Sequence, residues 1–230
     1  MYDLKMFEKN NYNQDGIFLH ETDDLSKMYA MIIGPSDTPY QHGFYFFEIT
    51  FPSTYPFMPP NVKFITSDPY KPTRLHPNLY IEGKVCLSIL GTWGGPEWTS
   101  ALTIGEVLIT IKSLMTQHTL RNEPGYEKYA DTNSQLQNYD RIIEYRNMVI
   151  TEYYLREIKN ISHIDVFADV IFEYFLTNID KYMNTIDGYI KKHGNKNKYS
   201  CRYQSLSTTT NWEELKNKLN QIKSNKEHSG

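Results

Sequence analysis

Apolar and β-branched residues gather in three short runs within the first third of the chain. These runs occupy residues 28–34, 43–51 and 61–66. Their aromatic and β-branched composition is typical of strands. Turn signals separate them: Gly34-Pro35 closes the first run, and the proline-dense segment FPSTYPFMPP divides the second from the third. Proline at this density excludes a helix or a central strand there. The pattern predicts an antiparallel meander of three or four strands.

From Thr103 onward the apolar spacing becomes helical. Apolar residues recur every three or four positions, which predicts an amphipathic helix that Thr103 or Ser100 would cap. The recurring residues are Ile104, Leu108, Ile111 and Met115. Further helices are predicted over residues 133–158, 164–192 and 212–223. A polar linker, GNKNKYS, is expected before the last of them.

Residues 70–100 contain no periodic run and hold several Pro, Gly and Asn. An irregular segment of this length inside a compact chain is uncommon unless it is functional. Strands therefore come first, an irregular segment follows, and only helices come after it. This order indicates an α+β fold with segregated elements. We expect a core of residues 1–157 and a helical C-terminal extension of residues 158–230.

Charge and composition narrow the classes of function. The chain has 24 Lys and Arg against 27 Asp and Glu, so it lacks the basic surplus of a non-specific nucleic-acid binder. No apolar run approaches the roughly 18 residues of a membrane span. No His lies at metal-ligand spacing from a Cys or carboxylate, and we expect neither a metal nor a cofactor. Two cysteines, Cys86 and Cys201, make no disulfide framework, so the cytoplasm or nucleus is expected, that of the host if the chain is viral.

One stretch of the irregular segment carries candidate chemistry. His76-Pro77-Asn78 precedes Cys86, which lies eight positions after Asn78 across a glycine turn. Acyl-thioester transfer requires a thiol nucleophile and benefits from an amide N–H that stabilises the developing oxyanion. The residue types and their spacing therefore favour such a site over an ordinary buried cysteine.

These segments, in this order, resemble the ubiquitin-conjugating enzymes. The matching stretches are IIGPSDTPYQHGFYFFEITFPSTYPFMPPNVKFIT, HPN, the glycine turn, VCLSIL, TW and the following helix. The resemblance covers about residues 17–150. GKVCLSILGTW and RNEPGYE are most similar to the long, C-terminally extended enzymes of the Z type and of the giant apoptosis-inhibitor type, and the tail resembles the Z type, which is the closest subfamily by this comparison of motifs. It implies the fold of that family: a four-stranded antiparallel meander, an active-site loop and flanking helices, with a helical extension added here.

The resemblance also implies a reaction and its partners. Cys86 would accept ubiquitin, or a ubiquitin-like modifier, as a thioester from an activating enzyme and pass it to a lysine of a protein substrate, usually with a ubiquitin ligase. A thioester already reacts with amines, so the reaction needs no cofactor. Phe57 and Pro96 match two exposed loops by which the family docks its ligases, and an exposed aromatic beside rigid prolines suits that purpose. Alternatively, each packs on its own core.

The residues around the thiol admit more than one role. Asn78 either stabilises the oxyanion or shapes the loop through backbone hydrogen bonds. His76 and Pro77 are expected to organise the loop, with proton transfer by His76 as the weaker alternative. By the resemblance, Glu123 takes the place of an acidic residue that orients the incoming lysine and helps its proton leave, the alternative being a solvated carboxylate. Trp93 is expected in the core.

The chain departs from the family pattern at its start. Only about residues 3–9 are available for the N-terminal helix that contacts the activating enzyme, a marginal length unless the helix packs on the core. Either that helix is short or translation begins upstream. Two other functions stay open: a catalytically silent module that binds ubiquitin or another partner, and a cysteine hydrolase. For a hydrolase, His76 and Asn78 lie too close in sequence to be the base and its orienter.

Overall fold

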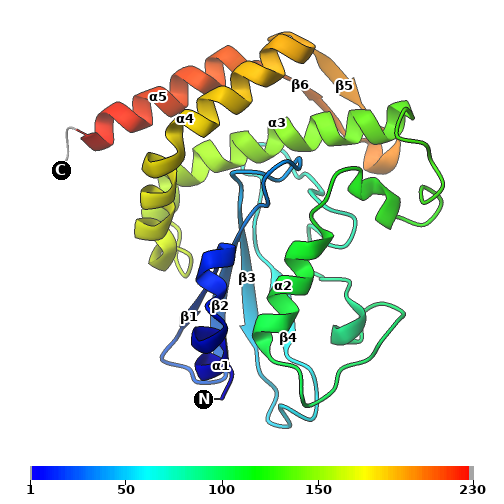
Figure 1. Cartoon of the computed structure of the whole chain (residues 1–230), viewed down its shortest axis with the longest axis vertical. Coiled ribbons are helices and arrows are strands. Elements are labelled where there is room, and N and C mark those ends of the chain that lie inside the picture. The colour runs from blue at the N-terminus through cyan, green and yellow to red at the C-terminus, as the bar shows by residue number, and fades with distance from the viewer. Residues whose placement is uncertain (1, 228–230) are drawn as a thin grey trace.

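The computed structural model describes residues 2–227 and contains a four-stranded antiparallel sheet (Figure 1). Its strands are β1 (Ile17–Glu21), β2 (Lys27–Ile33), β3 (Phe44–Thr50) and β4 (Asn61–Phe64), which pair in chain order. The predicted meander thus has four strands. The strand without a strong sequence signal is β1, because burial decreases along it from the buried Ile17 to the exposed Glu21.

All four helices predicted after residue 100 are present, as α2 (Ile104–Leu114), α3 (Ser134–Glu157), α4 (Ala168–His193) and α5 (Trp212–Glu227). A further helix, α1 (Tyr2–Asn10), precedes the sheet. Thr103 precedes α2, and its backbone N–H donates to the Glu106 carboxylate at 2.5 Å, as in a capping box. Among residues 2–227, no helix is both long enough and apolar enough to cross a bilayer.

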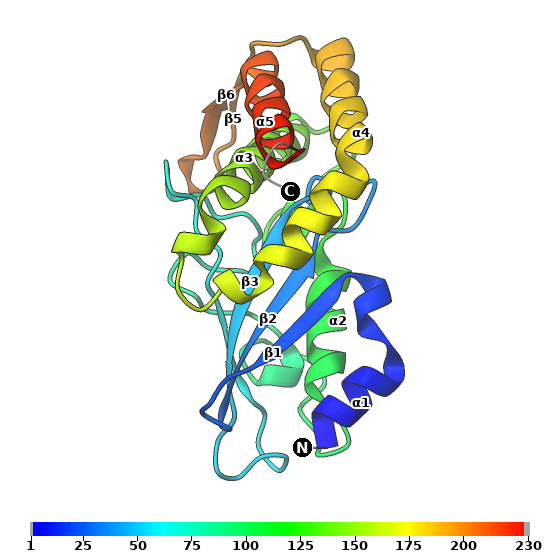
Figure 2. The same ribbon diagram turned by 90° about the vertical axis from the view of Figure 1, so that its left-hand side faces the viewer.

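The short helix α1 is held by packing against α2 (Figure 2). Phe7 on α1 is buried, and the buried Asp3 carboxylate links three segments. It accepts a hydrogen bond from the Tyr55 hydroxyl at 2.6 Å and another from the Ile104 N–H at 3.2 Å. A helix too short to be stable alone is therefore fixed to the start of α2 and to the proline-dense loop.

The C-terminal helices cover α3 rather than standing apart from it. Helices α4 and α5 lie side by side, and both contact α3 (Figures 1 and 2). Trp212 at the start of α5 packs between Tyr145 of α3 and Tyr189 of α4, with ring centroids 4.9 and 4.8 Å away. One apolar core continues from the sheet through α3 into the extension. The boundary at residues 157 and 158, where α3 ends, stays a prediction.

A small hairpin replaces part of the predicted polar linker, so that prediction is wrong for residues 198–200. Strands β5 (Lys198–Ser200) and β6 (Ser207–Thr209) pair antiparallel beside the N-terminal end of α3 (Figure 1). Asn138 of α3 donates to the Ser200 carbonyl at 2.9 Å. Strands of three residues without apolar alternation leave no periodic signal, and contacts with α3 stabilise them.

Candidate active site

Two reciprocal hydrogen bonds hold Asn78 against Cys86. The Cys86 N–H donates to the Asn78 carbonyl at 2.8 Å, and Asn78 Nδ2 donates to the Cys86 carbonyl at 3.0 Å. Gly83 makes the turn between them at a φ of 101°, where a side chain would be strained. Cys86 is 2% exposed and Asn78 9% exposed. The structure thus brings together the two residues that the sequence pairs, through the backbone of Cys86 and the side-chain amide of Asn78.

The Asn78 amide has donors for both of its predicted roles. An amide nitrogen carries two N–H groups, and one of them shapes the loop by bonding the Cys86 carbonyl. Within residues 2–227 the second N–H has no recorded hydrogen bond. Loop shaping therefore uses one hydrogen of the side chain and does not exclude the predicted oxyanion role of the other.

His76 is a buried, neutral part of the loop framework. Its Nδ1 accepts from the Asn78 N–H at 2.9 Å, and its Nε2 lies 3.0 Å from the Leu114 carbonyl at the end of α2. These partners assign the hydrogen to Nε2. Burial lowers the pKa of His76 to about 4. Because both nitrogens are engaged, the geometry favours loop organisation over proton transfer.

A buried ion pair that the sequence analysis missed anchors the start of the irregular segment. Asp68 has a fully buried side chain and receives two hydrogen bonds from the Arg146 guanidinium of α3, one of them from Nε at 2.7 Å. The same carboxylate accepts from the Thr73 hydroxyl at 2.8 Å. Residues 68–73 are therefore tied to α3 just before the His-Pro-Asn motif.

Arg74 continues this support into the motif itself. It is 7% exposed and donates from its guanidinium to the Pro77 carbonyl. Its guanidinium carbon also lies 3.5 Å from the centroid of the Tyr80 ring. Pro77 is thus held through its carbonyl, in agreement with a loop-organising role. Neither Asp68 nor Arg74 stands in a motif that marks it as buried.

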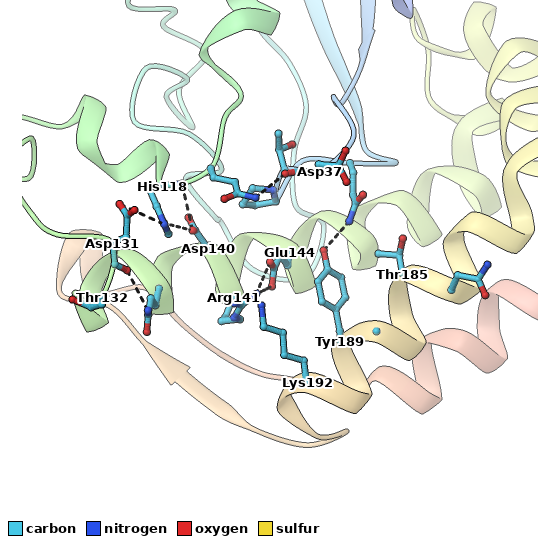
Figure 3. Close-up of a pocket in the computed structure, with 17 residues that line it drawn as sticks. Asp37, His118, Asp131, Thr132, Asp140, Arg141, Glu144, Thr185, Tyr189 and Lys192 are labelled. Carbon is cyan, nitrogen blue, oxygen red and sulfur yellow. Dashed lines mark hydrogen bonds and ion pairs between the residues drawn. The ribbon is translucent and has the colours of Figure 1, made fainter.

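The loop that carries Glu123 is tied to the core by its neighbours. Glu123 is half-buried and follows the 3₁₀ helix η3 (Thr119–Asn122). The Thr119 hydroxyl lies 2.6 Å from the buried Tyr40 hydroxyl. Figure 3 shows His118 reaching Asp140 of α3, with His118 Nδ1 2.6 Å from Asp140 Oδ2. Burial raises the pKa of Asp140, and His118 opposes that shift.

Within residues 2–227, no hydrogen bond joins Glu123 to Asn78 or Cys86. The structure therefore shows a loop that is well anchored at His118 and Thr119, with a carboxylate at its end. The role of Glu123 beside the thiol still rests on the resemblance.

The cavity in Figure 3 has a volume of about 660 Å³ and lies between the core and α4. Its ionisable side chains include an Arg141–Glu144 pair at 2.6 Å as well as the His118–Asp140 contact. Burial raises the pKa of Glu144 to about 7, and Arg141 opposes this. These side chains make the cavity between the core and α4 polar.

The predicted ligase-docking residues lie on two loops that are fastened together. Phe57 is 80% exposed, and Pro96 is exposed as well. Trp98 Nε1 donates to the Pro56 carbonyl at 2.7 Å, and its ring lies 5.9 Å from that of Tyr55. The two loops therefore present one surface in which Phe57 is an apolar, pre-ordered projection.

The prediction that Trp93 lies in the core is wrong, because its side chain is 48% exposed. Trp93 precedes Gly94 and Gly95 on the outer part of the loop, where Gly95 has a φ of 137°. The tryptophan that fixes this loop is Trp98, through the bond to the proline-dense loop. Sequence alone does not say which of two nearby tryptophans finds a partner.

Cys86 and Cys201 are both free thiols and both buried. Cys201, in the extension, donates from its thiol to the Gln135 carbonyl at 3.6 Å. In the part of the chain that the structure describes, no three His, Cys, Asp or Glu side chains converge on a metal position.

Comparison with known proteins matches residues 1–147 to the family described as "Ubiquitin-conjugating enzyme". Ubiquitin-conjugating enzyme E2 Z of Danio rerio is 47% identical over 125 residues, which are 54% of this chain and 38% of that protein. The Homo sapiens E2 Z is 45% identical over 128 residues, 56% of this chain and 36% of that protein. The aligned region thus spans less than two fifths of these relatives.

A more distant relative aligns over a longer stretch of this chain. The dual E2 ubiquitin-conjugating enzyme/E3 ubiquitin-protein ligase BIRC6 of Homo sapiens is 39% identical over 162 residues. These residues are 66% of this chain and 3% of that protein.

Proposed function

Because the chain belongs to the ubiquitin-conjugating enzyme family, we propose that it carries ubiquitin or a ubiquitin-like modifier as a thioester on Cys86. An activating enzyme supplies the modifier, and a lysine of a protein substrate receives it. The observation that carries this proposal is the reciprocal pairing of Cys86 with Asn78. This pairing supports the proposal because it joins a side-chain amide donor to the residue that carries the thiol.

Two acyl transfers make up the reaction. In the first, the Cys86 sulfur attacks the thioester carbonyl on the activating enzyme: the C–S bond to Cys86 forms, the C–S bond to that enzyme breaks, and the proton of the Cys86 thiol passes to the departing sulfur. In the second, a lysine amine attacks the Cys86 thioester, the C–N bond forms, the C–S bond breaks, and the amine loses a proton. No oxidant or reductant is consumed in either step.

In the second transfer the neighbouring side chains have different roles. The second Asn78 N–H stabilises the oxyanion that develops on the thioester carbonyl. Glu123 orients the lysine amine and receives its proton. His76 takes no proton, because Asn78 and Leu114 occupy both nitrogens. The same engagement argues against a cysteine hydrolase, which needs an imidazole base directed at the thiol.

The surface formed by Phe57 and Pro96 binds a ubiquitin ligase. Its support is the 80% exposure of an aromatic side chain on a loop that Trp98 holds in place. Such an anchor loses little conformational freedom on binding.

A charging assay tests the proposal. The protein is incubated with an activating enzyme, ATP and ubiquitin, and the products are separated on a non-reducing gel. We expect a reductant-sensitive adduct that Cys86→Ala abolishes and Cys201→Ala retains, since Cys201 is the other buried thiol of the chain. Absence of an adduct with every activating enzyme and modifier tested would refute the proposal. Asn78→Ala is expected to charge but to discharge slowly to free lysine.

A further inference from the structure

Tyr203 brings the C-terminal extension into contact with the catalytic loops. It lies in the 3₁₀ helix η6 (Tyr203–Ser205), between strands β5 and β6, and is 5% exposed. Gln204 and Ser205, which follow it, have φ values of 53° and 51°. Two successive non-glycine residues in the left-handed region are uncommon and cost free energy. The surrounding contacts therefore hold this turn, and they direct the Tyr203 ring inward.

The first of those contacts is with Arg74, whose guanidinium carbon lies 5.5 Å from the Tyr203 ring centroid. Tyr80 covers the same guanidinium at 3.5 Å. One ring therefore comes from the core and the other from the extension. Arg74 in turn donates to the Pro77 carbonyl. Because cation–π attraction strengthens when the cation is removed from water, Tyr203 helps to hold a buried arginine that fixes Pro77.

The second contact is with the loop of Glu123. The Tyr203 ring packs edge-on against Tyr126 of that loop, at 6.2 Å, and against Tyr139 of α3, at 5.9 Å. Burial raises the pKa of Tyr203 well above its usual value, and the Glu123 carboxylate adds to the increase. The hydroxyl makes no hydrogen bond of standard geometry within residues 2–227. The Tyr126 N–H in turn donates to the Glu123 carbonyl at 3.1 Å, so the Tyr203 ring packs on the turn that begins at Glu123.

We propose that Tyr203 is a positioning residue of the active site, which holds Asn78 through Arg74 and Pro77 and holds the turn of Glu123 through Tyr126. The expected effect of Tyr203 on modifier transfer rests on the proposed function. Its effect on the conformational stability of residues 74–86 does not. The extension is thus a structural part of the active site, although Tyr203 itself touches no reacting atom.

Four variants distinguish the effect of losing the Tyr203 ring from the effect of losing its hydroxyl and from a general destabilisation of the hairpin. Tyr203→Ala removes ring and hydroxyl, and Tyr203→Phe removes only the hydroxyl. Leu206→Ala is the matched control for lost burial, because Leu206 is 5% exposed in the same hairpin. Tyr199→Phe controls for loss of a hydroxyl in the half-buried position of β5.

Charging and discharge are measured separately for each variant. We expect Tyr203→Ala to slow discharge of the Cys86 thioester to free lysine by about tenfold, because its ring no longer holds Arg74 and Tyr126. Charging by the activating enzyme should change by less than about twofold, because that step does not use Glu123. Tyr203→Phe keeps the ring and should discharge like the unmodified chain, as should the two control variants. Discharge of Tyr203→Ala at the rate of Leu206→Ala would overturn the proposed effect on transfer.

Hydrogen exchange gives a second readout that needs no modifier. The amides of residues 74–86, including the Asn78 and Cys86 N–H groups, should exchange faster in Tyr203→Ala than in Leu206→Ala. Tyr203→Phe should restore their protection, since it keeps the ring over Arg74. Unchanged exchange in Tyr203→Ala would overturn the link to Asn78. A failure of the unmodified chain to charge would refute the proposed function, and exchange would still decide whether Tyr203 holds the loop.

Discussion

The burial of His76 predicts that stability falls between neutral and mildly acidic pH. The His76 ring is 0% exposed and lies between the Asn78 N–H and the Leu114 carbonyl. Burial lowers its pKa from 6.5 to about 4. Between these values the unfolded chain binds a proton that the folded protein does not bind. The contribution of His76 to stability is therefore fully present above pH 6.5 and is lost as the pH falls toward 4.

The size of this loss follows from the two pKa values. At pH 5 the unfolded histidine is almost fully protonated and the folded one is mostly neutral, so linkage gives a loss of about 2 kcal/mol. At pH 7.5 both states are neutral and the loss is about zero. Burial also lowers the pKa of His42 to about 4. His42 adds its own loss, but it does so equally in proteins that differ only at position 76.

Urea unfolding at the two pH values isolates the His76 contribution. His76→Asn keeps an acceptor near the Asn78 N–H but cannot be protonated, so its stability should fall by about 2 kcal/mol less between pH 7.5 and 5. The substitution also changes packing at both pH values, so the difference in stability between the two pH values is the quantity compared. His20→Asn, at an exposed position of β1, is the control and should leave that difference unchanged. Equal losses in His76→Asn and the unmodified chain would refute the assignment of a buried neutral ring.

Three further predictions follow from single contacts. Arg146→Ala should lower the free energy of unfolding by about 3–5 kcal/mol, because it leaves the Asp68 carboxylate buried and unpaired; urea unfolding measures this. Phe57→Ala should change stability by less than about 0.5 kcal/mol and leave discharge to free lysine intact, while ligase-stimulated transfer falls. Trp98→Phe should cost about 1 kcal/mol through loss of the bond to Pro56 and weaken the same stimulation, whereas Trp93→Phe should leave stability unchanged.

The parts of the fold that the sequence predicts are those with a local signal. The apolar stripes of α2, α3, α4 and α5 repeat over several turns, and strands β2 to β4 are short apolar runs between turn residues. The pairing of Asn78 with Cys86 is similarly local, because eight residues and a turn at Gly83 connect them. Such features depend on neighbouring residues and little on the rest of the chain.

The support of the site depends instead on residues distant in sequence. Asp68 and its partner Arg146 are 78 positions apart, as the numbering of their ion pair shows. Each looks like an ordinary surface charge in the sequence, since Asp and Arg are mostly exposed in proteins. Trp93 and Trp98 differ in the same way: only the second meets an acceptor, on a loop about forty residues earlier. These contacts form only when the chain folds, so they cannot be predicted from the spacing of residues in the sequence.

Tyr203 shows why a match to the family does not locate every residue that supports the site. The family match ends at residue 147, so it includes Cys86, Asn78 and Glu123 but not the hairpin of the extension. Yet the Tyr203 ring faces the guanidinium that holds Pro77 and packs against Tyr126 in the loop of Glu123. A comparison limited to the matched part would regard the extension as an appendage. The hairpin instead packs against Arg74 and Tyr126, so removing residues 198–209 should disturb the loops of Pro77 and Glu123 as well as the extension.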